Sequence, residues 1–321
     1  MTTLQITRRS DILPDVEMAA LAPVLADIER LKADRNAVVA AHNYMTPDIF
    51  ATADLRGDSL YLAQVARDTP ADIIVLAGVH FMAETAKIIN PQKTVLVPDL
   101  RAGCSLSEGI TGADVRRLRQ QHPGAPVVTY VNTSAEVKAE SDITCTSSNA
   151  VAVVESLGVD RVIFTPDQYL GRWVATQTEV DVVLWAGSCI VHERFTGAEI
   201  AEYRRDVGPI QVIAHPECPP DVLAEADYVG STHGMIEWVT TRQPDRVMMI
   251  TECSMADNVA SETPHTEYVR PCNLCPYMKR ITLDNIRASL ATLTHRVEIA
   301  PDIAARARRA VMRMLEVGRQ D

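Results

Sequence analysis

Cysteine gives this sequence its strongest sign of metal chemistry. Cys272-Asn273-Leu274-Cys275-Pro276 has the spacing of a metal-binding knuckle, and a proline after cysteine is common at iron–sulfur ligands. A zinc ribbon would need a second Cys-x-x-Cys pair, which the sequence lacks. Gly103-Cys104-Ser105 and Gly187-Ser188-Cys189 place two more cysteines in loops after expected strands, where open α/β sheets bind ligands. These cysteines indicate either a metal site or a set of buried apolar thiols.

Histidine and carboxylate residues form a second group with possible acid–base chemistry. Ala41-His42-Asn43-Tyr44 and Ala214-His215-Pro216-Glu217 each follow an expected strand, and each puts an imidazole near a phenol or a carboxylate. Such groups suit general acid–base catalysis, although a single histidine in this setting is more often structural. Tyr130-Val131-Asn132 is a third polar pair, because alternation along a strand points Tyr130 and Asn132 to the same side.

Short β-branched runs alternate with amphipathic helical stretches and must position these residues. The expected strands are Ala37–Ala41, Ile73–Ala77, Thr94–Pro98, Val127–Val131, Arg161–Thr165, Asp181–Trp185, Gln211–Ala214 and Arg246–Thr251. The expected helices include Ser59–Asp68, Phe81–Ile89, Ala113–His122, Ser148–Leu157, Pro219–Ala226, Met235–Thr241 and Asp302–Gly318. Apolar runs separated by helices are typical of parallel sheets with crossover connections, so the predicted fold class is α/β.

Hydroxyl residues recur where three of the expected helices begin. Gly57-Asp58-Ser59, Thr146-Ser147-Ser148 and Gly230-Ser231-Thr232 follow one another at intervals of about 87 residues. This spacing predicts three similar domains. Ordinary helix N-capping, which favours Ser, Thr and Asp, explains the same residues equally well.

Composition narrows the classes of function. The 321-residue chain has 47% hydrophobic and 23% charged residues and a net charge of −11, which argues against nucleic acid or an anionic membrane as partner. Anionic small molecules would instead bind at local donors such as helix N-termini. Residues 1–15 show no apolar export signal, so we expect a cytoplasmic protein. Its seven cysteines should therefore stay reduced and form no disulfide framework.

The ordered motifs resemble the quinolinate synthase family from about residue 30 to residue 290. They are Ala41-His42-Asn43-Tyr44, Gly57-Asp58-Ser59, Tyr130-Val131-Asn132-Thr133, Cys145-Thr146-Ser147-Ser148-Asn149, His215-Pro216-Glu217-Cys218, Gly230-Ser231-Thr232 and Cys275-Pro276-Tyr277-Met278. The resemblance implies three pseudo-symmetric α/β/α domains with small parallel sheets around a central active site. We assign residues 1–92 with 277–321 to the first domain, 93–180 to the second and 181–276 to the third.

The family's implied reaction condenses iminoaspartate with dihydroxyacetone phosphate, with loss of phosphate and water, to give quinolinate for NAD biosynthesis. The resemblance also implies one [4Fe–4S] cluster held by Cys104, Cys189 and Cys275, with Cys272 as a non-ligand. Three cysteine ligands leave one iron open, and such an iron can act as a Lewis acid. Besides the two substrates, a transient contact with L-aspartate oxidase is implied.

Roles for individual residues follow from the same resemblance. Catalytic roles fall on His42, Tyr44, His215 and Glu217, and substrate-binding roles fall on His42, Ser59, Tyr130, Asn132, Ser147, His215, Glu217 and Thr232. Ser59, Ser147 and Thr232 would bind phosphate or carboxylate groups at helix N-termini. The stretch Thr251–Asn258 departs from the family's usual pattern, and we interpret Cys253 as structural.

Two other classes of function stay open at this stage. A Schiff-base aldolase or lyase acting on a triose phosphate would use Lys138 as its nucleophile. A non-catalytic zinc or iron–sulfur scaffold would use only Cys272 and Cys275. It would keep its function after substitution of Cys104 or Cys189.

Overall fold

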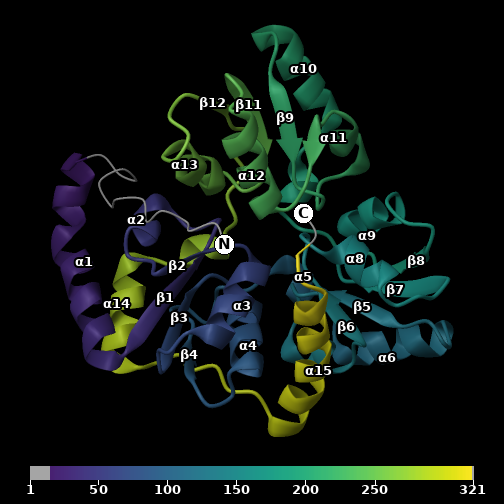
Figure 1. Cartoon of the computed structure of the whole chain (residues 1–321), viewed down its shortest axis with the longest axis horizontal. Coiled ribbons are helices and arrows are strands. Elements are labelled where there is room, and N and C mark those ends of the chain that lie inside the picture. Colours follow the sequence, from purple (N-terminus) through teal and green to yellow (C-terminus); the bar gives the residue numbers. More distant parts are fainter. Residues whose placement is uncertain (1–14, 320–321) are drawn as a thin grey trace.

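Three small parallel sheets, each of four strands flanked by helices, surround a common centre (Figure 1). The structure is a computed structural model that describes residues 15–319. The expectation about an export signal therefore falls outside the described residues, apart from Asp15. The three sheets have the orders β2-β1-β3-β4, β6-β5-β7-β8 and β10-β9-β11-β12, so one topology is repeated three times. The α/β fold class and its three similar units are confirmed.

The first sheet contains the N-terminal elements and packs with a helix from the C-terminal part of the chain. Its elements are α1 (Asp15–Arg35), β1 (Ala37–His42), α2 (Pro47–Phe50), β2 (Leu55–Gly57), α3 (Ser59–Asp68), β3 (Ile73–Ala77), α4 (His80–Ile89) and β4 (Thr94–Leu96). Every residue of β3 is buried, as expected for a strand covered by helices on both faces. The late helix α14 (Leu283–Thr292) packs against α1 and β3.

The second and third sheets are built in the same way. The second has α5 (Ser105–Glu108), α6 (Gly112–Gln121), β5 (Val127–Tyr130), α7 (Ala135–Ala139), β6 (Ile143–Cys145), α8 (Ala150–Glu155), β7 (Arg161–Thr165), α9 (Gln168–Ala175) and β8 (Asp181–Leu184). The third has η2 (His192–Arg194), α10 (Gly197–Val207), β9 (Gln211–Ala214), α11 (Pro220–Ala224), β10 (Tyr228–Val229), α12 (Thr232–Arg242), β11 (Arg246–Ile250), α13 (Ser254–Ala260) and β12 (Glu267–Val269). The 3-10 helix η3 (Met278–Arg280) then precedes α14.

Helix α15 (Pro301–Val317) joins two of the sheets. It packs against α7 and β6 of the second sheet and against α4 of the first. In Figure 1 this yellow helix runs from the lower edge of the molecule toward its centre. Its last turn therefore ends close to the place where the three units meet.

The strand predictions were right in the middle of each sheet and incomplete at the edges. All eight expected strands form, with ends that differ by at most two residues. The four missed strands, β2, β6, β10 and β12, all lie at sheet edges and contain only two or three residues. A strand of two or three residues is too short to show a periodic pattern in the sequence, even where it is buried as in β6.

Strand pairing also bears on the domain boundaries. The boundaries at residues 92/93 and 180/181 would assign β4 and β8 to the following domains, but β4 pairs with β3 and β8 pairs with β7. We therefore propose boundaries that lie after these two strands.

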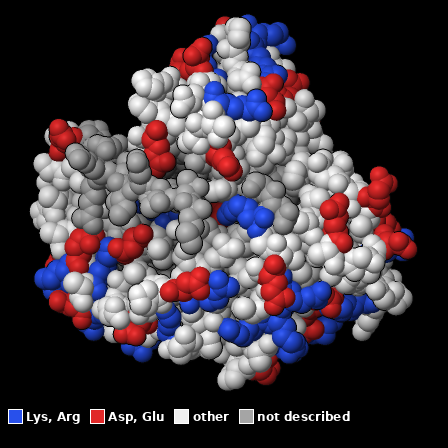
Figure 2. Space-filling view, in the orientation of Figure 1, with Lys and Arg blue, Asp and Glu red and all other residues white. Residues whose placement is uncertain are grey.

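None of the helices within residues 15–319 combines the length and apolar character needed to cross a membrane. On the face in Figure 2, acidic and basic side chains are interspersed over the lower half.

Candidate active site

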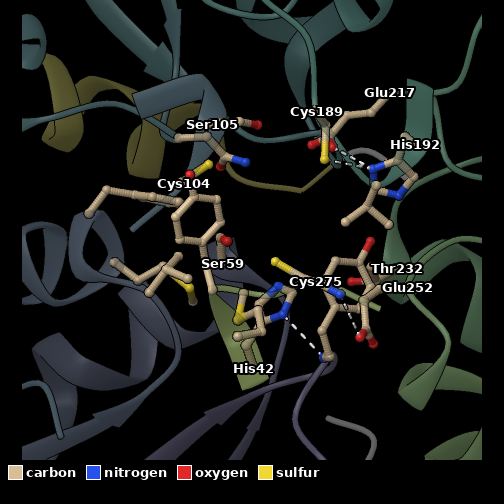
Figure 3. A pocket seen from close by; sticks show the side chains of 18 of the residues that line it. His42, Ser59, Cys104, Ser105, Cys189, His192, Glu217, Thr232, Glu252 and Cys275 are labelled. Atoms are coloured by element: carbon tan, nitrogen blue, oxygen red, sulfur yellow. Dashed lines mark hydrogen bonds and ion pairs between the residues drawn. The ribbon is translucent and has the colours of Figure 1, made fainter. Parts of the chain in front are cut away.

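A central cavity lies where the carboxyl ends of the three sheets converge. It brings together all twelve residues to which the sequence assigned a site role. These are His42, Tyr44, Ser59, Cys104, Tyr130, Asn132, Ser147, Cys189, His215, Glu217, Thr232 and Cys275. In Figure 3 the sulfur atoms of Cys104, Cys189 and Cys275 are directed toward the same space. The cavity is thus a shared site to which each unit contributes.

The three cysteines occupy equivalent loops. Each follows the last strand of its sheet and precedes a short helical turn. In each loop the sulfur accepts hydrogen bonds from the backbone N–H groups two and three residues further on: Leu106 and Ser107 for Cys104, Val191 and His192 for Cys189, Tyr277 and Met278 for Cys275. Hydrogen bonds of this kind to sulfur are typical of iron–sulfur sites, where they help to set the cluster's potential. The donor set therefore fits a cluster with three cysteine ligands.

A threonine seven residues after each cysteine completes the repeat. Thr111, Thr196 and Thr282 are the N-caps of α6, α10 and α14, and each side chain accepts a hydrogen bond from the N–H three residues ahead. The pattern Cys-x6-Thr is present three times in the sequence and was not among the predicted repeats. Each of the three cysteine loops thus leads into a helix that is capped in the same way, so the fold places the sulfurs in a threefold arrangement.

Burial keeps these thiols protonated when no cation is bound. It raises the pKa of Cys104 to about 12 and also raises the pKa of Cys189 and of Cys275. Metal binding displaces such protons, because the thiolate is the form that coordinates. Cys145 and Cys218 are fully buried free thiols that do not line the cavity.

Glu217 is the centre of a polar wall that lies next to Cys189. Its Oε1 accepts a hydrogen bond of 2.6 Å from the Tyr130 hydroxyl, and its Oε2 lies 2.8 Å from His192 Nδ1. Burial alone would raise the pKa of this carboxyl, but the neighbouring imidazole of His192, with His215 and Tyr130, holds the pKa below its ordinary value. Glu217 is therefore a buried carboxylate whose donors are already in place.

A hydrogen-bonded chain leads from Glu217 to Tyr44. Since His192 Nδ1 donates to the carboxylate, its Nε2 is the acceptor toward Thr251 Oγ1 at 3.0 Å. Thr251 Oγ1 in turn lies 2.6 Å from the Tyr44 hydroxyl. Burial raises the pKa of Tyr44, so its phenol keeps its proton at neutral pH. The chain Tyr44–Thr251–His192–Glu217 can pass a proton between the cavity and the carboxylate.

His42 and His215 are neutral imidazoles with defined tautomers. Burial lowers the pKa of His42 to about 4 and that of His215 to about 3. Each Nδ1 accepts a backbone N–H two residues ahead, from Tyr44 at 3.2 Å and from Glu217 at 3.4 Å. Each Nε2 therefore carries the proton, and that of His215 lies 3.2 Å from Ser147 Oγ.

The hydroxyl residues combine capping with exposure to the cavity. Asp58 and Ser231 are the N-caps of α3 and α12, which leaves the first helical residues, Ser59 and Thr232, to line the cavity. The first and third motifs thus each combine a helix N-cap with a residue that lines the cavity. Ser147 was expected at a helix N-terminus, but α8 begins three residues further on, at Ala150. The position of Ser147 comes from the loop's own bonds, in which Asn149 Oδ1 accepts the Thr146 N–H at 2.8 Å.

Glu252 and Lys279 tie the third cysteine loop to the histidine loop. Glu252 Oε1 accepts the Cys275 N–H at 3.2 Å and pairs with Lys279 Nζ at 2.9 Å. Lys279 also donates to the Tyr44 carbonyl at 2.8 Å. Glu252 is almost fully buried, so this ion pair fixes both loops from inside the molecule.

One expectation about the cysteines was wrong. Cys253 and Cys272 form a disulfide bond, although all seven thiols were expected to be reduced. The two residues are 19 apart in sequence, but the segment after β11 runs beside the Cys272 knuckle, where Cys253 N–H donates to the Asn273 carbonyl at 3.2 Å. That pairing is tertiary and has no local sequence signal. The structural role expected for Cys253 and the non-ligand role of Cys272 agree with this bond.

The residues of the two alternative functions are engaged elsewhere. Lys138 is fully buried, donates to the Thr133 carbonyl, and has its ammonium 5.5 Å from the Phe81 ring centre. Burial lowers its pKa to about 8, which suits a nucleophilic amine, but Lys138 is not among the described residues that line the cavity. A scaffold based on Cys272 and Cys275 would lack one thiolate while the Cys253 bond stands.

Three functional residues were missed: His192, Thr251 and Glu252. His192 had a signal, since Cys189-Ile190-Val191-His192 has a ligand-like Cys-x-x-His spacing, and Cys189, His192 and Glu217 offer donor atoms within 4.8 Å of one another. Thr251 and Glu252 directly follow β11, at the sheet edge where polar residues were predicted for other strands. Their roles depend on partners from other units, which the sequence does not reveal.

Fold and site together define a class of α/β enzyme in which three repeated units place three cysteines and an acid–base wall around one cavity. The model of the quinolinate synthetase A protein family matches residues 26–316. The chain belongs to this family.

It is 61% identical over 307 residues to quinolinate synthase 2 of Mesorhizobium japonicum, with 95% of each chain covered. Quinolinate synthase of Sinorhizobium medicae is 57% identical over 308 residues, covering 96% of this chain and 86% of the relative. That of Xylella fastidiosa is 59% identical over 295 residues, covering 91% and 87%.

Proposed function

We propose that this protein forms quinolinate from iminoaspartate and dihydroxyacetone phosphate, with loss of phosphate and water, as an iron–sulfur-dependent transferase of NAD biosynthesis. The observation that carries the proposal is the threefold set of cysteine loops facing one cavity with Glu217, His42 and His215, in a member of this family. We expect the reaction to take place in the cytoplasm. Contact with L-aspartate oxidase remains a prediction.

Cys104, Cys189 and Cys275 would hold a [4Fe–4S] cluster through their thiolates. When bound with three cysteine ligands, such a cluster supplies one iron that can polarise a hydroxyl or carboxylate of the substrate. The N–H donors behind each sulfur stabilise the negative charge of the thiolates, and the Glu252–Lys279 pair holds the Cys275 loop in place.

Glu217 is the group best placed to accept a proton during condensation and ring closure. Its lowered pKa keeps it charged, and Tyr130 and His192 fix its orientation. The relay through His192 and Thr251 lets Tyr44 donate or recover a proton on the cavity's other side. His42 and His215, as neutral imidazoles with a protonated Nε2, are donors to substrate oxygens.

Ser59, Ser147 and Thr232 would bind the phosphate and carboxylate groups. Ser59 and Thr232 start α3 and α12, where backbone N–H groups and the helix dipole favour anions. Tyr130 and Asn132 would orient the substrate between these sites. Among residues 15–319, the buried Asn132 Oδ1 has no hydrogen-bond partner, so it is free to accept one from a ligand.

The experiment is anaerobic purification followed by iron analysis and a quinolinate assay. We expect a brown protein with about four irons per chain that forms quinolinate. Cys104→Ala, Cys189→Ala and Cys275→Ala should each lose iron and activity, while the control Cys145→Ala should keep both. A colourless, iron-free protein that forms quinolinate would contradict the proposal. Full activity in Cys189→Ala would point to the Lys138 or scaffold alternatives.

A further inference from the structure

Arg319, two residues after the end of α15, closes a hydrogen-bonded triangle with Asp58 and Ser148. Its Nη2 donates to both Asp58 carboxylate oxygens at 2.9 Å, and its Nη1 donates to Ser148 Oγ at 3.0 Å. Ser148 Oγ donates to Asp58 Oδ2 at 2.7 Å. Only 20% of the Arg319 side chain and 7% of the Asp58 side chain are exposed. This is a largely desolvated ion pair with well-formed charge-assisted bonds.

The triangle adjoins the hydroxyl sites of two units, and Asp58 itself also lines the cavity. Asp58 precedes Ser59, and Ser148 follows Ser147, so each partner of Arg319 is the chain neighbour of a cavity hydroxyl. The two loops come from the first and second sheets and are 90 residues apart in sequence. Arg319 therefore acts on both hydroxyl loops at once.

Charge explains why an arginine is needed there. Asp58 caps α3 by accepting the Tyr61 N–H at 2.8 Å, so a buried carboxylate already occupies a helix N-terminus that would bind an anion. Burial alone would raise the pKa of Asp58, but Arg319 outweighs it and lowers the pKa, so the carboxylate stays charged. Without a counter-charge this carboxylate would repel an anionic ligand at Ser59. The guanidinium cancels that charge and leaves Ser59 and nearby N–H groups available.

The segment that carries Arg319 is anchored to the same loop. Asn149 Nδ2 donates to the Gly318 carbonyl at 2.9 Å, while its Oδ1 accepts the Thr146 N–H. Helix α15 itself packs against β6, the strand that leads into this loop. The position of Arg319 is thus fixed by the loop of Ser147.

We propose that Arg319 is a positioning residue for the anionic groups of the substrates at Ser59 and Ser147. It acts by neutralising Asp58 and by holding the two hydroxyl loops together. The inference rests on the proposed function for the identity of the substrates, but the charge effect itself is measurable by ligand binding alone.

The test measures binding of quinolinate and of inorganic phosphate to anaerobic, cluster-loaded protein by calorimetry, together with steady-state kinetics. Arg319→Ala should weaken binding of both ligands by about tenfold or more, because the carboxylate loses its counter-charge. The KM for dihydroxyacetone phosphate should rise while kcat changes less. Iron content should stay that of the wild type. Arg309→Ala, which removes an exposed arginine of the same helix, is the control and should leave all values unchanged.

A second variant separates charge from simple stability. Asn caps helices as well as Asp does, so Asp58→Asn removes the charge while keeping the cap. The double variant Asp58→Asn/Arg319→Ala should therefore bind both ligands more tightly than Arg319→Ala alone. Unchanged binding in Arg319→Ala, or no recovery in the double variant, would overturn the inference. A wild-type protein that forms no quinolinate would overturn the proposed function instead, and the binding measurements would still decide the role of Arg319.

Discussion

The cysteine loops and the strand-end loops of the three units have diverged to very different degrees. The loops of Cys104, Cys189 and Cys275 share the same backbone bonds to sulfur and the same threonine caps. The loops that face them carry His42-Asn43-Tyr44 in one unit, Tyr130-Val131-Asn132 in the next and His215-Pro216-Glu217 in the third. Repeated loops suit a symmetric task, the holding of a cluster. Diverged loops suit the asymmetric task of moving protons and orienting two different substrates.

The largest expected effect on turnover comes from a substitution in the diverged loops, at Glu217. Glu217→Gln keeps the shape but removes the charge, so turnover should fall by about 10²–10⁴-fold if this carboxylate accepts the proton. Quinolinate formation and iron content are the two measurements. Iron should be unchanged, because the cysteine loops are untouched. A variant that keeps wild-type turnover would assign the base to another residue.

The buried histidines of the diverged loops should make the folded protein less stable at acidic pH. The unfolded chain protonates His42 below about pH 6.5, whereas the folded state keeps it neutral down to about pH 4. Unfolding therefore takes up a proton in this window, and stability falls as the pH falls from 6.5 toward 4. Between pH 7 and pH 5 the contribution of His42 is about 2 kcal/mol. Urea unfolding of cluster-free protein should show this loss reduced in His42→Gln.

The exposed His265 provides the matched control for that measurement. His265→Gln should keep the acid sensitivity of the wild type, since this side chain is exposed and lies outside the cavity. Equal pH dependence in His42→Gln and His265→Gln would show that His42 is not the acid-sensitive group.

A smaller effect on turnover should come from interrupting the hydrogen-bonded chain between Tyr44 and Glu217. Thr251→Val removes the hydroxyl between Tyr44 and His192 at nearly constant volume, so kcat should fall by roughly tenfold. The pH–rate profile should change shape, because the hydrogen-bonded link between Tyr44 and Glu217 would be interrupted. Thr165→Val, at a buried threonine in β7, should lower stability without altering that profile.

The smallest expected effects concern stability, and they test whether the three cysteine loops contribute equally to it. Thr111→Ala, Thr196→Ala and Thr282→Ala should each lower the free energy of unfolding by about 1 kcal/mol, the usual value of a helix N-cap. Thr240→Ala, on the exposed face of α12, should change it by less than about 0.5 kcal/mol. If only one of the three substitutions lowered the free energy of unfolding, the three caps would have the same geometry but different contributions to stability.

Sequence patterns predicted the parts of the fold that bury many residues. The central strands of all three sheets could be found because both of their faces are apolar, whereas β10, with two residues, leaves no pattern. The helix after Ser147 was expected to begin at Ser148, but α8 begins at Ala150, after the N-cap Asn149, whose Oδ1 accepts the Thr146 N–H. The disulfide between Cys253 and Cys272 was missed because it joins segments that meet only through the sheet of β11.

The sequence alone determined which chemical groups exist, how they are spaced within each loop, and which family's motifs they match. The three units, the cysteines and the polar strand ends could all be inferred from it, because each depends on contacts within a short stretch. Only the tertiary structure decided that His192 and Thr251 link Tyr44 to Glu217 and that Arg319 compensates Asp58. Those pairings join residues that lie far apart in the sequence. Their energies depend on distance and burial in the folded chain, and neither quantity is encoded in local sequence.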